Sequence, residues 1–290
     1  MHKKLFTAFP VVIFTILSTL SCSRNDNEFL TVEDTQNEVV ISNELSNKRT
    51  TAIAEDSQGH IWIGTFRGLN RHDVNEIHPY FCTDDKSSIC DNQINDIFLD
   101  SKGKLWISTI GGVCIYTDRD CFERIDIKDQ EKNIYQILES SDGRYFFNTN
   151  SSILEYFPAD GRIETRLQNI APSPTFKFQK SKCLLDKSNR LWVICNDCLQ
   201  CYETVTFTQV ETIPTDGEIT ASYFDSAQNK LWIACSDKIS QFDLLTTRVK
   251  PLPINITSRS GSEKTSINII SPYGTSSLLL NSFEHVLMLF

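Results

Sequence analysis

One short pattern recurs about six times along the chain, and it constrains the fold more than any other feature of the sequence. An aromatic or leucine residue marks the centre of each copy, and consecutive centres are 40 to 47 residues apart. The centres are Trp62, Trp106, Phe146, Trp192, Trp232 and Leu279. Such a period indicates an array of similar structural units rather than one irregular core.

A turn residue precedes most of these centres at a fixed distance. Gly or Asn stands three positions before the centre, at positions 59, 103, 143, 189 and 229. Both residue types adopt a positive φ at little steric cost, which a tight hairpin requires at one fixed place. The sequence therefore predicts a tight turn before the centre of each of the first five copies.

The segments after the turn have the composition of strands. Runs such as Ile61-Trp62-Ile63 are apolar at consecutive positions, which is typical of a strand covered on both faces. Third strands are expected at Gly68–His72 and Gly112–Tyr116. Outer edge strands are expected at Glu76–Phe81 and Cys121–Ile127. A recurring Trp at the centre of such a unit indicates core packing.

A period of about 43 residues fits a four-stranded propeller blade and is too long for ankyrin or leucine-rich repeats. Helical arrays share this period, but they need apolar residues at i, i+3, i+4 and i+7 over a dozen positions. These runs are instead short, β-rich and interrupted by Gly or Asn. The sequence therefore predicts an all-β fold, a β-propeller of about six four-stranded blades over residues 38–290, preceded by a signal segment.

The last copy is degraded or truncated. It spans Ile267–Phe290, where Leu278-Leu279-Leu280 replaces the Trp core and the turn residue shifts to Gly274. This copy supplies three strands, and Glu38–Ser42 is expected to complete its sheet and so to close a six-bladed ring. The alternative is a ring cut short.

The N-terminus has the layout of an export signal. Two lysines precede an apolar run from Leu5 to Leu20, which is shorter than the roughly 20 residues of a spanning helix. Residues 1–22 are therefore predicted to be a signal peptide and residues 23–37 a linker. The stretch ending at Cys22 resembles a bacterial lipobox, whose cysteine takes lipid after cleavage, and an uncleaved anchor is the alternative. The protein is expected to be exported, and to be periplasmic or attached to the membrane through its N-terminus alone.

The net charge of the chain bears on whether nucleic acids are expected as partners. The chain has 28 Lys and Arg against 37 Asp and Glu, a net charge of −9, and no basic run interrupts that balance. A nucleic-acid surface is therefore not expected. Apolar residues make up 40% of the chain, which excludes intrinsic disorder.

Motifs for catalysis are scarce, and no catalytic residue is predicted. The sequence has no Gly-x-Ser-x-Gly, His-Glu-x-x-His or phosphate-loop motif. His60 stands where other copies have Lys or Arg, which indicates a solvent-facing position. Acidic residues recur at one place in the motif, and repetition of that kind indicates a turn cap rather than a metal or acid–base site. They are Asp56, Asp100, Asp186 and Asp225.

The cysteines allow three interpretations. The run Cys195-x-x-Cys198-x-x-Cys201 has a spacing that suits thiolate coordination, but no His lies nearby to complete a zinc site. Cys195 and Cys235 occupy the Thr position of other copies, so packing as small apolar side chains is the favoured interpretation. No metal or other cofactor is predicted.

A disulfide is the remaining interpretation of the cysteines. Nine remain when Cys22 is set aside, so at least one is unpaired or pairs with another chain. The candidates for a bridge are Cys82–Cys90 and a pair within the Cys195 to Cys201 run.

The best copy of the motif is specific enough to suggest a family. The run from Ala54 to Arg71, with Gly59, Ile61-Trp62-Ile63-Gly64-Thr65 and Gly68-Leu69 at fixed places, is very similar to the two-component regulator propeller repeat. That repeat fills the periplasmic sensor region of hybrid two-component systems in gut-type Bacteroidetes. The resemblance implies a sensor that responds to oligosaccharides and passes its signal to a kinase.

The chain departs from that family in one respect. No second propeller, transmembrane helix after the sensor, kinase, receiver or DNA-binding domain is expected in it, so the sensor is predicted to lack its own kinase. The expected partners are an oligosaccharide or another protein, and a dimer is a further expectation. The alternatives are a propeller-fold polysaccharide lyase or glycoside hydrolase, and a non-functional gene remnant.

The ligand site is expected on one face of the propeller. Propellers bind ligands over the central channel or on a loop face, and the hairpin between the second and third strands is one location. It places Phe66, Arg67 and Ile110 as candidate binding residues. Paired carboxylates about 5 to 9 Å apart in the channel would favour an enzyme, whereas an apolar or mixed channel would favour binding.

Overall fold

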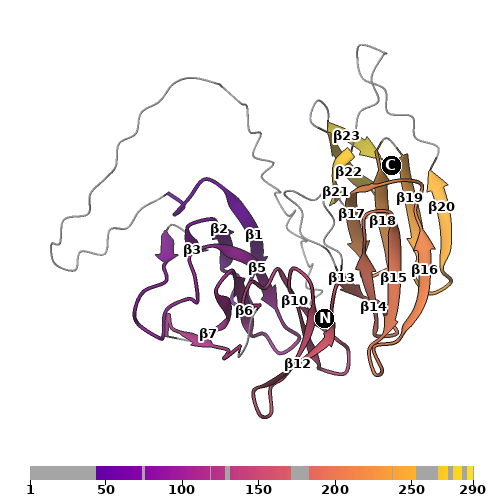
Figure 1. Cartoon of the computed structure of the whole chain (residues 1–290). Helices are drawn as coiled ribbons and strands as arrows, with labels where there is room; N and C mark the ends of the chain where they lie inside the picture. Colours follow the sequence, from indigo (N-terminus) through magenta and orange to yellow (C-terminus); the bar gives the residue numbers. More distant parts are fainter. Residues whose placement is uncertain are drawn as a thin grey trace, which may run out of the picture. The chain divides into compact units, whose positions relative to one another are not determined.

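A computed structural model of the chain (Figure 1) describes residues 44–73, 76–117, 119–127, 131–170, 183–236, 238–252, 267–273, 277–282 and 286–289. The predicted signal peptide and linker, the lipidation site Cys22 and the closing strand Glu38–Ser42 lie outside these residues. So does the turn residue Gly274.

The described residues form strands arranged in six antiparallel sheets, and consecutive strands are hydrogen-bonded neighbours. The first blade contains β1 (Thr50–Glu55), β2 (Ile61–Thr65), β3 (Gly68–His72) and β4 (Ile77–Tyr80). The second contains β5 (Ile94–Leu99), β6 (Leu105–Thr109), β7 (Gly112–Tyr116) and β8 (Phe122–Arg124). The third contains β9 (Gln136–Glu139), β10 (Tyr145–Asn148), β11 (Ile153–Phe157) and β12 (Arg162–Leu167).

The other three sheets repeat this order. The fourth blade contains β13 (Cys183–Leu185), β14 (Arg190–Ile194), β15 (Cys198–Glu203) and β16 (Gln209–Pro214). The fifth contains β17 (Ile219–Asp225), β18 (Lys230–Cys235), β19 (Lys238–Asp243) and β20 (Arg248–Leu252). The sixth sheet has three described strands: β21 (Ile267–Tyr273), β22 (Ser277–Ser282) and β23 (Val286–Leu289). The predicted all-β fold with a repeated four-stranded sheet is confirmed.

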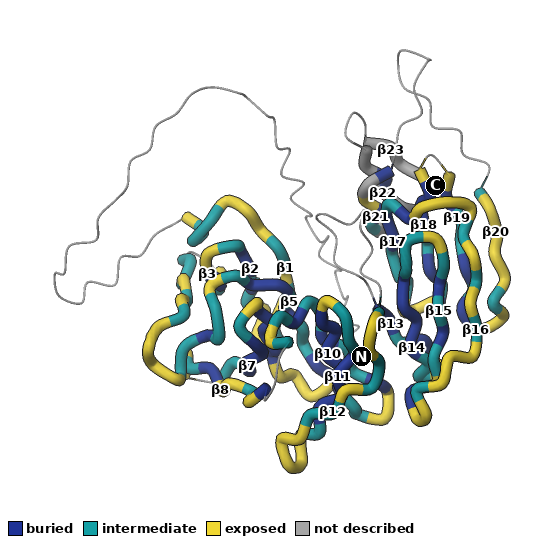
Figure 2. Tube along the Cα trace, in the orientation of Figure 1, coloured by how far each residue is buried: buried dark blue, intermediate teal, exposed yellow. Residues whose placement is uncertain are grey.

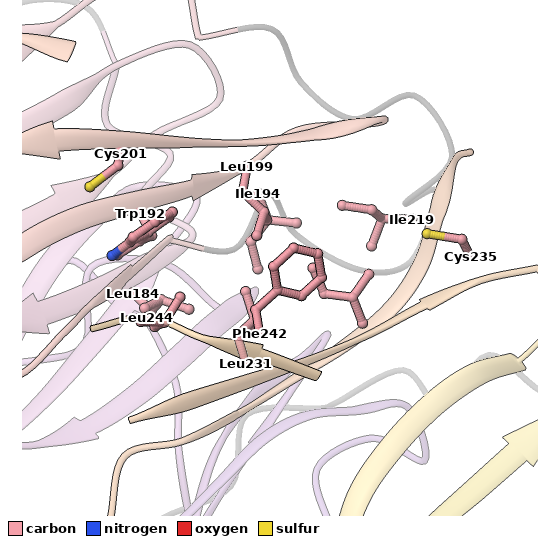
Figure 3. Packing of buried hydrophobic residues seen from close by; sticks show 11 residues of the cluster. Leu184, Trp192, Ile194, Leu199, Cys201, Ile219, Leu231, Cys235, Phe242 and Leu244 are labelled. Carbon is pink, nitrogen blue, oxygen red and sulfur yellow. The ribbon is translucent and has the colours of Figure 1, made fainter. Parts of the chain in front are cut away.

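Hydrophobic packing joins each sheet to the next one along the chain. Each of the five buried clusters takes side chains from two consecutive sheets. Figure 3 shows the cluster between the fourth and fifth blades, where Trp192 and Leu184 meet Leu231 and Phe242. Among the described residues, no buried cluster joins the sixth sheet to the first blade. The chain is thus a β-propeller in which every seam between consecutive blades is an apolar interface.

The central residues of the repeat lie in these interfaces. Trp62, Phe146 and Trp192 are 0% exposed and Trp106 is 2% exposed, which confirms the prediction of core packing. Trp232 is half-buried. Burial follows strand position (Figure 2): the second strand of each of the first five blades is mostly buried, whereas fourth strands such as β16 and β20 are largely exposed.

The turn residues have the predicted conformation. Gly59, Gly103 and Gly143 have φ of 86°, 78° and 81°, and Asn189 and Asn229 have φ of 59° and 56°. All five therefore adopt the left-handed conformation that favours Gly and Asn.

Replacing one of these glycines tests the turn directly. We expect Gly143→Ala to lower the free energy of unfolding by about 1 kcal/mol, because Ala is strained at positive φ. Nothing lies within 4 Å of the added Cβ, so a clash does not contribute. Gly143→Asn is the matched control and should cost less in urea denaturation. Equal losses for the two variants would contradict this explanation.

Membrane attachment is not provided by a described helix. No helix in the described part of the chain is long and apolar enough to span a bilayer.

Candidate functional site: a cavity between the innermost strands

In the second blade, a buried carboxylate organises the turn between the first and second strands. Asp100 Oδ1 accepts hydrogen bonds from the backbone N–H groups of Lys102 and Lys104, at 2.9 and 2.8 Å. Its Oδ2 accepts from Trp106 Nε1 at 2.9 Å and from the Tyr145 hydroxyl, in the next blade, at 2.8 Å. The carboxylate therefore closes the turn and fixes the central Trp at once.

Two other blades repeat this arrangement. Asp56 and Asp186 cap their own turns and accept from the indole N–H groups of Trp62 and Trp192, at 2.8 and 3.0 Å. The predicted turn-cap role is confirmed for these residues. Asp225 departs from the pattern because it stands seven residues before Trp232 rather than six, and its Oδ1 accepts from the Gln228 N–H.

These hydrogen bonds make the free energy of unfolding depend on pH in the acidic range. Burial alone would raise the pKa of Asp100, but hydrogen bonds from Trp106, Lys104 and Tyr145 outweigh it and hold the pKa below its usual value of 3.8. A carboxyl whose pKa falls on folding contributes stability above its unfolded pKa and loses it as the pH falls through the folded value.

We therefore expect the urea midpoint to fall as the pH is lowered from 5 through about 4 and below. Asp100→Asn should flatten this dependence, because Asn does not titrate. A pH dependence below 5 that is the same in Asp100→Asn and in the parent chain would contradict this assignment.

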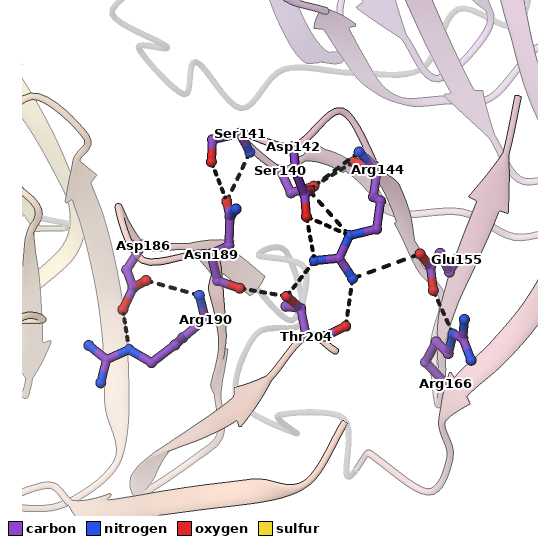
Figure 4. A network of polar contacts seen from close by, with 10 residues as sticks. All are labelled: Ser140, Ser141, Asp142, Arg144, Glu155, Arg166, Asp186, Asn189, Arg190 and Thr204. Atoms are coloured by element: carbon purple, nitrogen blue, oxygen red, sulfur yellow. Dashed lines mark hydrogen bonds and ion pairs between the residues drawn. The ribbon is translucent and has the colours of Figure 1, made fainter. Parts of the chain in front are cut away.

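A second set of hydrogen bonds joins the turns of neighbouring blades (Figure 4). The Ser141 N–H and hydroxyl donate to Asn189 Oδ1, at 2.9 and 3.0 Å, and the Lys187 N–H donates to Asn229 Oδ1 at 3.0 Å. Asn at this position thus supplies both the positive φ and an acceptor for the preceding blade. The third blade has Gly143 at this position, which has no side chain to accept a hydrogen bond. There Glu139 accepts from the N–H and hydroxyl of Ser101 in the preceding blade.

Arginines reinforce the same seams. Arg144 donates to the Thr204 carbonyl and hydroxyl in the next blade, at 2.6 and 2.8 Å (Figure 4). Arg190 pairs with Asp186 at 2.8 Å and donates to the carbonyl of Leu244 one blade further on. These residues occupy the repeat position of His60 and, like His60 itself, are half-buried, so the position is less open to solvent than predicted for His60.

A cavity of about 480 Å³ lies among the innermost strands. Its walls come from the first strands of the second to fifth blades and from β21, with β14 and β18 contributing one residue each. The apolar lining includes Phe98, Leu138, Leu185, Tyr223, Phe224 and Ile270. The polar lining consists mainly of Gln136, Glu139, Ser222 and Ser226. The volume falls in the range of small-molecule sites.

A shallower depression of about 640 Å³ lies over the turns and shares Glu139, Leu185, Phe224 and Ser226 with the cavity. We refer to the two together as the axial site. The site is mixed in character, with aromatic and aliphatic walls and a few amides, hydroxyls and charged groups.

The carboxylates of the axial site are held by the protein itself. Glu139 accepts from the Ser101 N–H and hydroxyl, both at 2.7 Å. Asp142 pairs with Arg144 at 2.9 Å, and Asp186 is held by Arg190 and Trp192. Each of these carboxylates therefore has a structural role at a turn or a seam.

Comparison with known proteins identifies the repeats. The sequence profile of the two component regulator propeller family matches residues 44–67 and 88–111. The chain contains two-component regulator propeller repeats. The matched segments span the β1–β2 and β5–β6 hairpins, together with the residues that precede each. A search of curated proteins found no match to the sequence.

Solved structures share the fold of this propeller. One is the extracellular domain of a protein described as a one component system from B. thetaiotaomicron, with a TM-score of 0.65 and 18% identity. The match covers 84% of this chain, which spans 33% of that one. Virginiamycin B lyase from Staphylococcus aureus has a TM-score of 0.60 and 15% identity, covering 86% and 85% of the two chains. A catalytically inactive His-to-Ala variant of that lyase with quinupristin has a TM-score of 0.58 and 15% identity, covering 84% and 86%.

The residues predicted to bind ligand lie on hairpins outside the axial site. Phe66 is half-buried beneath the Arg49 guanidinium, which lies 4.0 Å from its ring centroid. Arg67 is exposed, and Ile110 is 37% exposed at the β6–β7 turn. The structure therefore does not bring these three residues into the cavity. Their role in binding stays a prediction.

The described histidines all lie in the first blade. His60 Nδ1 is 3.0 Å from Asp56 Oδ2, and His78 Nε2 is 3.0 Å from Asp73 Oδ2. Among the described residues, no His lines the axial site. No group of three or more His, Cys, Asp or Glu in that part of the chain could hold a metal ion.

The cysteines of the described chain are free thiols. Four of them are buried: Cys114, Cys183, Cys201 and Cys235. Packing as small apolar side chains is confirmed for these four. Burial raises the pKa of the Cys183 and Cys195 thiols to about 12, which makes them poor nucleophiles.

Proposed function

We propose that this chain is an exported ligand-sensing β-propeller, the sensor part of a two-component system, and that an oligosaccharide binds in the axial site. The observation that carries the proposal is the cavity between the innermost strands, which has mixed walls and carboxylates already held by the protein. A site of this kind can bind a ligand but presents no free acid–base pair.

The lining suits a sugar. The C–H faces of a pyranose ring are apolar and stack on aromatic side chains, and the hydroxyls take hydrogen bonds from amides and hydroxyls. Tyr223 and Phe224 on β17 and Phe98 on β5 supply the rings. Gln136 supplies an amide; its Oε1 already accepts from the Cys183 N–H at 3.0 Å. Sensing would follow if a bound ligand changed the contacts at the turns that border it.

The test is a thermal-shift screen of the purified full chain against oligosaccharide libraries. A glycan at about 100 times its Kd should stabilise the fold by about 2.7 kcal/mol. Phe224→Ala should weaken binding about fivefold, because a stacking contact is worth about 1 kcal/mol. Val205→Ala, at a site 81% exposed and outside the axial site, is the matched control. No stabilisation by any glycan, or equal affinity in both variants, would overturn the proposal.

Export and lipidation belong to the same proposal. Expressed in a bacterium with labelled palmitate, the full chain should enter the membrane fraction with label, and Cys22→Ala should lose that label. Label retained in Cys22→Ala would exclude lipidation at Cys22.

The second candidate is a lyase, because a lyase shares this fold over about 85% of both chains. A similarity at 15% identity shows only that the two proteins share a fold. In addition, no histidine lines the described axial site. Turnover of an oligosaccharide or of a streptogramin such as quinupristin by the purified chain would favour this candidate over sensing.

A further inference from the structure

Three cysteines meet at the seam between the first and second blades. Cys82 follows β4, Cys90 precedes β5, and Cys114 lies on β7. Cys90 packs against the buried cluster that contains Cys114, and the two thiols lie close enough for each to shift the pKa of the other. The Cys82 thiol instead donates to the Cys90 carbonyl oxygen, at 3.4 Å. The thiol that faces Cys90 is therefore that of Cys114.

The two thiols differ in access. Cys114 is 0% exposed and packs in the cluster that contains Ile94 and Ile107. Cys90 is half-buried and lines a pocket of about 680 Å³. A reagent in solution can therefore reach Cys90, whereas Cys114 is shielded behind it.

The pocket is lined by several cations, and we call it the cationic pocket after Lys86, Arg124 and Lys132. Glu123 and Asp126 also line it. Arg124 is fixed in place, because its Nε donates to the Ser88 carbonyl at 3.0 Å and its guanidinium also donates to the Ile89 carbonyl at 3.0 Å. Its positive charge is thus held beside the loop that carries Cys90.

Electrostatic effects favour the thiolate form at Cys90 and the protonated thiol at Cys114. The hydrogen bond from Cys114 lowers the pKa of the Cys90 thiol against the opposing effect of burial, and Arg124 and Lys132 lower it further, against Asp91. The same hydrogen bond and burial raise the pKa of Cys114. Thiolates are the nucleophilic form of cysteine, and exposed low-pKa thiols beside cations are the reactive ones.

The backbone holds the Cys90 loop against the second blade. A Cβ added at Gly111 would lie 2.9 Å from the Cys90 carbonyl oxygen, and one added at Gly112 would lie 3.7 Å from Cys90 Sγ. The absence of a side chain at Gly111 lets the loop approach this closely, whereas the contact at Gly112 is an ordinary van der Waals distance. The β6–β7 turn therefore holds Cys90 beside the start of β7, two residues before Cys114.

We propose that Cys90 is a thiol–disulfide exchange site and that Cys114 is its resolving partner. In the first step the Cys90 thiolate attacks a low-molecular-weight or protein disulfide, R–S–S–R. An S–S bond forms between Cys90 and one R–S group as the original S–S bond breaks, and RS⁻ leaves. In the second step Cys114 gives its proton to that thiolate and attacks the Cys90 sulfur, and a second RS⁻ leaves. The two cysteines are oxidised to a disulfide, and one external disulfide is reduced to two thiols.

The test uses the reduced full chain and oxidised glutathione as the disulfide. After treatment at pH 7.5 and blocking of the remaining thiols, peptide mass spectrometry should find a Cys90–Cys114 cross-link. The apparent Tm should rise by about 5 °C, because the bridge ties the loop between the first and second blades to β7. Cys121→Ser, at another half-buried cysteine of the second blade, is the matched control and should keep the cross-link.

Two variants separate the steps. Cys114→Ser should trap the mixed disulfide of glutathione on Cys90, whereas Cys90→Ser should take up no glutathione at Cys114. An unmodified Cys90, or a Cys82–Cys90 cross-link in place of the expected one, would overturn the proposal.

A measurement on the parent chain needs no cysteine variant. Alkylation of Cys90 should be half-maximal below about pH 8.5, the pKa of an ordinary thiol. Lys132→Gln should slow alkylation at pH 7 about threefold, by removing one cation from the cationic pocket. A midpoint above 9 in the parent chain would exclude an activated thiol.

Discussion

Removing the carboxylate of Asp100 is expected to lower the free energy of unfolding by about 3 to 5 kcal/mol. In Asp100→Ala the indole N–H of Trp106, the hydroxyl of Tyr145 and two turn amides all lose their acceptor. A buried donor left without a partner costs about 1 to 3 kcal/mol, and several are left here. Urea denaturation should show a lower midpoint with an unchanged slope.

Asp225→Ala is the matched control for this experiment. Asp225 begins the corresponding turn of the fifth blade, where its Oδ1 accepts from one backbone amide, and it is half-buried. Its loss should cost about 1 kcal/mol. Equal losses for the two variants would show that the Asp100 carboxylate contributes no more than a turn cap.

The second large effect is expected at the centre of the fourth blade. Trp192→Ala should destabilise the fold by about 3 to 5 kcal/mol, because the indole is 0% exposed and fills the interface with the fifth blade (Figure 3). Trp192→Phe should recover part of this loss. It keeps an aromatic ring in the cluster but removes the N–H that Asp186 accepts.

Trp232→Ala provides the comparison within the same repeat. Trp232 holds the equivalent place in the fifth blade but is half-buried. Its truncation therefore removes less buried apolar area than truncation of Trp192. Its loss should be clearly smaller in the same denaturation experiment. A loss at Trp232 as large as that at Trp192 would contradict the burial argument.

The repeat made the fold predictable because its signals are local. A Gly or Asn at positive φ, an apolar second strand and a fixed period each lie within one copy, and the structure has the strands Gly68–His72 and Gly112–Tyr116 as predicted. The outer strands are shorter than predicted, at Ile77–Tyr80 and Phe122–Arg124.

The axial site was harder to predict from the sequence than the fold. Its lining comes from first strands that lie about 40 residues apart, and these strands carry a weaker motif than the Trp-centred ones. The bond between Tyr145 and Asp100, and the seam between Ser141 and Asn189, likewise join different copies. An alignment of the copies shows what each repeat position contains, but it does not show which atoms meet across a seam.

The direction of the seam hydrogen bonds has a consequence for how such a chain changes over time. In the second, third and fourth blades the residue after the turn Asp or Ser donates its amide forward, from Ser101 to Glu139, from Ser141 to Asn189 and from Lys187 to Asn229. A duplicated copy would therefore keep this bond at its new junction where its turn carries Asn or is preceded by Glu. The extra residue in the turn before Trp232 leaves this acceptor in place, because Asn229 still accepts from the Lys187 N–H.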